Sequence, residues 1–99
     1  MELTIKKENG VLSIAGNGRL DTVTSAELNA KLEETGYEDV DIDFDFTGIE
    51  YISSAGLRLI LALQKQADET GNKLVIRNIN KVVAEIFRVA GFNKSLTIV

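Results

Sequence analysis

The sequence lacks two residue types on which much enzyme chemistry depends. It contains no cysteine, which excludes a disulfide framework and any thiolate metal or redox site. It also contains no histidine, the commonest general base and zinc ligand in proteins. These two absences argue against most hydrolytic and metal-dependent enzymes. We therefore expect no catalytic residue, no bound metal and no cofactor.

Positive charge and long apolar runs are also scarce. Fifteen acidic and 11 basic residues give a formal net charge of −4, which disfavours nucleic acid and anionic membranes as partners. No apolar run approaches the ~18–20 residues of a membrane span, and the N-terminal stretch MELTIKKENG does not have the pattern of a signal peptide. We expect a soluble, cytoplasmic domain with neither nucleic acid nor membrane as a partner.

The residues that are present suit one globular domain over positions 1–99, since 44% of them are apolar and 26% are charged. Two strand-like segments, 2–7 and 11–15, flank Asn9-Gly10, a favoured pair for a two-residue hairpin turn. The GNG that follows predicts that the second strand ends there. Residues 40–46 read VDIDFDF, so apolar and acidic side chains alternate. This alternation predicts a sheet with one packed face and one wet face.

Three helices are expected between the strands. A capping box of Thr24 and Glu27 predicts the start of the first, which Gly36 ends, with Asp21 and Thr22 just before it or as an earlier cap. The second should run from about 54 to 70 and stop at Gly71. In the third, Asn80 is expected to be the N-cap and Gly91 the C-terminal cap. Its expected apolar stripe consists of Val82, Val83, Ile86 and Val89. The resulting order, ββαβαβαβ, predicts an α/β fold in which a mixed sheet combines an N-terminal hairpin with α/β crossovers.

The acidic strand offers an enzymatic alternative. DFDFT at 43–47 resembles the DxDxT motif of haloacid-dehalogenase-like phosphatases, in which Asp43 would attack phosphorus and Asp45 would handle the leaving group, with magnesium. That chemistry also needs a second aspartate pair and a lysine on the phosphoryl group. After Asp45 the only aspartate is Asp68, inside a predicted helix. A solvated sheet face is the simpler explanation of the acidic run.

The stretch IEYISSAGLRLI (49–60) passes from strand-like to helix-like composition through small residues. Ser54 is expected to be the N-cap of the helix, its hydroxyl exposed beside unpaired backbone N–H groups and the positive end of the helix dipole. Phosphorylation there would add about −1.5 to −2 charges, which a helix N-terminus tolerates. Position alone leaves two interpretations open: Ser54 only caps the helix, or it also accepts a phosphate.

Three segments together resemble the STAS domains, the bacterial anti-sigma factor antagonists. DFTGIEYISSAGLRLIL (45–61) is similar to their central motif, and GRLDTVTSAEL (18–28) to the loop before their first helix. VVAEIFRVAGFNKSLTI (82–98) is similar to their third helix, the glycine after it and the last strand. The resemblance covers nearly the whole chain and implies a small mixed sheet with helices mainly on one face.

The resemblance also implies a partner switch. The unphosphorylated protein would bind an anti-sigma factor that is also a serine kinase; this kinase would use ATP and magnesium to phosphorylate Ser54, and a PP2C-type phosphatase would restore the binder. The residues it implies for partner binding are Asp21, Thr22, Ser53, Ser54, Ala55, Gly56 and Arg58. Two of them have an alternative role: Asp21 as the cap of the first helix, and Gly56 as the residue that lets its helix pack on the sheet.

The chain departs from the family pattern at two places. Ser53 stands where many members carry aspartate, which leaves Ser53 as the alternative site of phosphorylation. The sequence also stops at Val99, without the fourth helix that many members have after the last strand. We expect a monomer or a weak dimer. A STAS-like interaction module that is never phosphorylated remains the alternative function.

Overall fold

The fold is described by a computed structural model covering residues 1–92 and 94–99; Asn93, within the third segment of the resemblance, lies outside the described residues. The elements of the described part are β1 (Leu3–Glu8), β2 (Val11–Leu20), α1 (Thr22–Thr35), β3 (Asp41–Ile52), α2 (Ser54–Thr70), β4 (Leu74–Arg77), α3 (Lys81–Val89) and β5 (Thr97–Ile98). This confirms the predicted order, ββαβαβαβ, and the α/β class.

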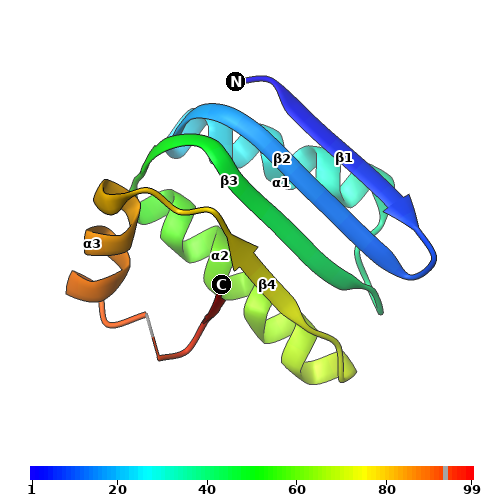
Figure 1. The fold of residues 1–99 in the computed structure, drawn as a ribbon. Coiled ribbons are helices and arrows are strands. Elements are labelled where there is room, and N and C mark those ends of the chain that lie inside the picture. Colours follow the sequence, from blue (N-terminus) through cyan, green and yellow to red (C-terminus); the bar gives the residue numbers. More distant parts are fainter. Residues whose placement is uncertain (93) are drawn as a thin grey trace.

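One mixed sheet organises the molecule, with the strand order β1-β2-β3-β4-β5 (Figure 1). The pair β1 and β2 is antiparallel, and each later neighbour runs parallel to the one before it. Each parallel connection passes through a helix, as parallel pairing requires. Helices α1 and α2 lie on the same side of the sheet in Figure 1, which leaves the opposite face open.

The N-terminal hairpin forms where the sequence predicts it. Asn9 and Gly10 have φ of 51° and 78°, the positive values that a two-residue turn of this kind needs. The prediction that the GNG segment ends the second strand is wrong, because β2 continues to Leu20 and pairs with β3 through two register shifts. Close approach is the reason for small residues here: a Cβ on Gly48 would lie 2.5 Å from the carbonyl oxygen of Gly16.

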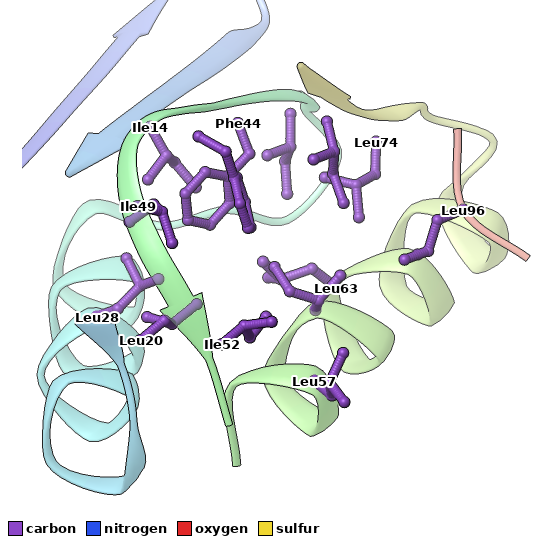
Figure 2. Close-up of a cluster of buried hydrophobic side chains, with 14 of the residues drawn as sticks. Ile14, Leu20, Leu28, Phe44, Ile49, Ile52, Leu57, Leu63, Leu74 and Leu96 are labelled. Atoms are coloured by element: carbon purple, nitrogen blue, oxygen red, sulfur yellow. The ribbon is translucent and has the colours of Figure 1, made fainter. Parts of the chain in front are cut away.

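The core lies between the sheet and the helices (Figure 2). Alternate residues of β3 point into it, so the predicted packed face is confirmed by the buried side chains of Ile42, Phe44 and Phe46. The ring of Phe46 lies 4.7 Å from that of Phe44 and 6.1 Å from that of Phe87 on α3, between ring centroids, within the range of favourable aromatic pairs.

The three aspartates of β3 lie half-buried on the open face and contact the segment around β4. The contacts are Asp41 Oδ1 with Lys73 N (2.9 Å), Asp43 Oδ1 with Arg77 Nε (2.7 Å) and Asp45 Oδ1 with Asn78 Nδ2 (3.0 Å). Asp45 also accepts hydrogen bonds from the hydroxyl and the backbone N–H of Thr47. These two bonds, together with the one from Asn78, lower the pKa of Asp45. The two aspartates of the DFDFT motif therefore bond to β4 and to the residue after it, which explains them without phosphatase chemistry.

The helix boundaries follow local signals well. Helix α2 spans the predicted residues and ends at Gly71, and Asn80 caps α3 by accepting from the N–H of Val83 at 2.8 Å. The C-cap of α3 is Ala90, one residue before the predicted Gly91. Within residues 1–92 and 94–99, no helix has the length and apolarity that crossing a bilayer would require.

The predicted apolar stripe of α3 is only partly right. Val83 is buried and Ile86 is half-buried, but Val82 and Val89 are 54% and 71% exposed. Phe87 fills the core instead. Positions 83, 86 and 87 share one helical face, whereas 82 and 89 lie beside that face.

Candidate functional site

Two helices begin side by side at one end of the sheet. Leu20 and Ile52 are the last residues of β2 and β3 and face each other in the register. The backbone N–H of Ser53 donates to the carbonyl oxygen of Leu20 at 2.9 Å, which ties the two strand ends together. α1 and α2 start within two residues of this point. The carboxyl ends of neighbouring parallel strands are where α/β sheets commonly receive ligands.

The N-cap of α2 is Ser53 and not Ser54, so the prediction for the cap is wrong by one residue. Strand β3 runs on to Ile52, which leaves Ser53 as the single extended residue before the helix. Its Oγ accepts from the backbone N–H of Gly56 at 3.3 Å, and its side chain is half-buried. Ser54 becomes the first helical residue. It is exposed, as the sequence predicts.

Asp21 caps α1. Its Oδ1 accepts from the backbone N–H groups of Val23 and Thr24, both at 3.0 Å, while Thr24 Oγ1 accepts from the N–H of Asp21 at 2.8 Å. This reciprocal pair replaces the predicted capping box of Thr24 and Glu27, because the helix begins earlier than that box requires. The N–H and hydroxyl of Thr24 donate to the Asp21 carboxylate and lower its pKa. Capping by Asp21 is thus confirmed; its contact with a partner stays a prediction.

The Asp21 cap makes stability depend on acid pH. Because the folded state lowers the pKa of Asp21, the cap stabilises fully above the unfolded-state pKa near 3.8 and is lost as the pH falls through the lower folded-state value. Asparagine is as good an N-cap as aspartate, but its side chain does not titrate. The melting temperatures of the native chain and of Asp21→Asn should therefore differ by a constant amount between pH 5 and 7. Below about pH 4 the melting temperature of the native chain should fall relative to that of Asp21→Asn. A difference that stays constant to pH 2 would contradict the capping role.

Gly56 is a buried residue in the first turn of α2. A Cβ at this position would lie 2.7 Å from Ile52 Cγ1, 2.8 Å from the carbonyl oxygen of Leu20 and 3.2 Å from Leu20 Cγ. Of its two proposed roles, the structure supports the packing of α2 on its own sheet. Gly56 is buried in the folded chain, and its contact with a partner stays a prediction.

The other predicted site residues surround the same corner. Three of them are exposed: Thr22, Ser54 and Arg58. Three more are half-buried: Asp21, Ser53 and Ala55. All belong to the first turns of α1 and α2 or to their caps, so the fold brings residues 21–22 and 53–58 to one end of the molecule.

Sequence reasoning missed one pair at this corner. Arg19 and Tyr51 face each other between β2 and β3, and Arg19 Cζ lies 4.3 Å from the centre of the Tyr51 ring. Arg19 also lines a shallow groove beside the corner, whose residues are Met1, Asn17, Gly18, Arg19, Asp21, Thr24, Gly48 and Glu50. The pairing of β2 with β3 brings Arg19 and Tyr51 together, and no local motif signals that pairing.

The chemistry available at the corner is that of hydroxyls, one capping carboxylate and two exposed arginines. The described residues contain no group of three or more side chains that could hold a metal ion. An exposed serine hydroxyl at a helix N-terminus can accept a phosphate, and the surrounding exposed side chains can meet a partner.

Comparison with known proteins gives one family for the whole chain. The family model described as "Mlab, STAS domain" matches residues 1–99. BtrV of Bordetella bronchiseptica, provisionally described as an anti-sigma factor antagonist, is 31% identical over 93 residues, covering 93% of this chain and 80% of BtrV.

Two solved structures have the same fold. One is TM1081 of Thermotoga maritima, also provisionally described as an anti-sigma factor antagonist, with a TM-score of 0.84, 17% identity, and coverage of 97% of this chain and 84% of that one. The other is the anti-sigma factor antagonist SpoIIAA of Bacillus in its unphosphorylated form, with a TM-score of 0.82, 17% identity, and coverage of 99% and 88%. At these identities the likeness concerns the fold.

Proposed function

Because the chain belongs to the STAS domain family and its relative BtrV is provisionally described as an anti-sigma factor antagonist, we propose that it is a binding protein, a partner switch controlled by one serine. Unphosphorylated, it binds an anti-sigma factor that is also a serine kinase. Phosphorylation of Ser54 ends the complex, and a PP2C-type phosphatase restores binding. The kinase binds the ATP and magnesium that the phosphate transfer needs, so this chain needs no cofactor of its own.

The observation that carries the proposal is the exposure of Ser54 on the first turn of α2. A kinase must reach the hydroxyl with its ATP, and Ser54 is open to solvent. The neighbouring Ser53 is half-buried, and its Oγ is engaged with the backbone N–H of Gly56. Phosphorylating Ser53 would require this half-buried oxygen to leave its contact with Gly56. This contrast favours Ser54 over Ser53 as the modified residue.

The surface around Ser54 suits a protein partner. Thr22 and Arg58 are exposed beside it, and Arg19 stacked on Tyr51 extends the same end of the molecule. Arginine and tyrosine are enriched where protein interfaces gain most of their affinity. The docking area of this proposal therefore consists of Arg19, Asp21, Thr22, Tyr51, Ser53, Ser54, Ala55 and Arg58.

Incubation with a purified anti-sigma factor kinase from the same organism and radiolabelled ATP tests the proposal. The native chain should take up one phosphate. Ser54→Ala should take up none and should still bind the kinase, because alanine removes only the acceptor hydroxyl from an exposed position. The matched control is Ser53→Ala, which keeps Ser54 and should retain the label.

Each other result points elsewhere. Label that persists in Ser54→Ala and disappears in Ser53→Ala would move the site to Ser53. A native chain that binds the kinase but is never labelled would leave a STAS interaction module without a phosphorylation switch. Absence of both binding and labelling would contradict the proposed partner class.

A further inference from the structure

In the part of the chain that the structure describes, the outer edge of β1 has no partner strand. Among these residues β1 pairs with β2 alone, and its other side is the free edge seen in Figure 1. Below this edge runs a groove between β1 and α1, lined by Leu3, Ile5, Lys31, Glu34 and Thr35. Leu3 and Ile5 are only half-buried. A free strand edge above partly exposed apolar side chains is a template for a further strand.

The hairpin register determines which backbone groups face outward. Glu8 and Val11 flank the two-residue turn, so they form a hydrogen-bonded pair, and such pairs alternate along an antiparallel ladder. Residues 4, 6 and 8 therefore direct their N–H and C=O groups toward β2. Residues 3, 5 and 7 direct theirs toward the free edge. An added strand would bond to Leu3, Ile5 and Lys7.

We propose that this edge pairs with β1 of a second copy of the chain, antiparallel about a two-fold axis at Thr4. In this register Leu3 faces Ile5 of the second copy as a hydrogen-bonded pair, twice by symmetry. On the open face, Glu2 lies opposite Lys6 and Thr4 opposite Thr4. The pairing thus joins apolar to apolar side chains over the groove and opposite charges on the other face.

Charge favours this register among the symmetric ones. An axis at Leu3 would place Glu2 opposite Thr4 and form no pair of opposite charges. An axis at Ile5 would place Glu2 opposite Glu8, and an axis at Lys6 would place two Lys6 side chains together. Both arrangements set like charges directly opposite each other, which destabilises a sheet. Charged side chains on an edge strand discourage pairing with most other strands. Here the charges of Glu2 and Lys6 favour a second copy in the register centred on Thr4.

The α1 wall of the groove is compatible with that partner. Lys31 and Glu34 carry opposite charges, so the residues with which α1 lines the groove have no net charge, and the walls of two copies do not repel each other. The edge lies outside the partner-binding residues around Ser54, so this inference does not depend on the proposed function.

Sedimentation velocity of the full chain from 10 µM to 1 mM tests the inference. The native chain should show a concentration-dependent dimer. Glu2→Lys and Lys6→Glu should each weaken dimerisation about tenfold or more, because each converts two attractive cross-strand pairs into repulsive ones. The double variant Glu2→Lys/Lys6→Glu should dimerise like the native chain, since the pairs are restored with reversed sign.

Lys65→Glu is the matched control, because it changes the net charge as Lys6→Glu does but lies exposed on α2. It should leave the dimer unchanged. Hydrogen exchange gives a second measurement: the amides of Leu3 and Ile5 should become protected as concentration rises, whereas those of Thr4 and Lys6 should be protected throughout. A native chain that stays monomeric at 1 mM, or a dimer that the double variant does not recover, would overturn the proposal.

Discussion

Replacing Gly56 by alanine is expected to lower the free energy of unfolding by about 1–2 kcal/mol. Overpacking a tight site typically costs about 1–3 kcal/mol and occasionally more. Alanine also stabilises a helix by about 1 kcal/mol relative to glycine. The free-energy cost of overpacking should exceed this gain, since the added methyl group meets a fixed backbone atom as well as a side chain.

The fixed atom is the carbonyl oxygen of Leu20, which would lie 2.8 Å from the new Cβ. It accepts the hydrogen bond of Ser53 N that joins β2 to the start of α2, so it cannot move away without breaking that contact. The side chain of Ile52, 2.7 Å from the new Cβ, is itself fully buried and has little space to rotate. α2 must therefore tilt away from the sheet.

Equilibrium unfolding in urea measures this effect. The matched control is Ala62→Gly, an exposed position in the same helix, where the loss should be about 1 kcal/mol from helix propensity alone. A Gly56→Ala chain as stable as the native one would contradict the packing role of Gly56.

Local chemistry made much of the fold predictable. Asn9-Gly10 specifies a hairpin turn, Gly36 and Gly71 end helices, and Asn80 starts one; each signal acts over a few residues and needs no information from elsewhere in the chain. The alternation of β3 likewise predicted the packed and open faces of the sheet, because residues two apart in a strand share a face.

The errors arose where distant segments decide the outcome. β2 continues through the GNG segment because β3 pairs with it, and the stacking of Arg19 on Tyr51 follows from the same pairing. The exposure of Val82 and Val89 depends on how α3 is rotated against the sheet. These contacts cannot be read from local sequence.

The N-cap of α2 was predicted to within one residue. The motif located the corner, and the structure confirms that Ser54 is exposed there. The cap moved to Ser53 because the end of a strand is set by its neighbours in the sheet, which a local pattern does not specify.

A phosphate on Ser54 is expected to lower the affinity for the anti-sigma factor kinase at least 100-fold. Such a change corresponds to about 2.7 kcal/mol of binding free energy. A phosphate adds about −1.5 to −2 charges and three strongly hydrated oxygens. In an interface shaped around a hydroxyl, the phosphate must lose its water, and a negative group of the proposed partner that faces it would repel it; like charges placed together in an interface cost several kcal/mol.

The fold itself should tolerate the modification. Ser54 lies in the first turn of α2, where a negative group interacts favourably with the helix dipole by about 0.3–1 kcal/mol. The melting temperature of the phosphorylated chain should therefore equal or slightly exceed that of the native chain. Loss of binding would then reflect the interface and not unfolding.

The central claim is tested most directly with a half-phosphorylated sample of the chain passed over the immobilised anti-sigma factor kinase without nucleotide. Mass spectrometry of the bound and unbound fractions then reports the phosphate on Ser54 in each. The switch predicts a bound fraction with almost no phosphate and an unbound fraction enriched in it. Equal phosphate at Ser54 in both fractions would contradict it.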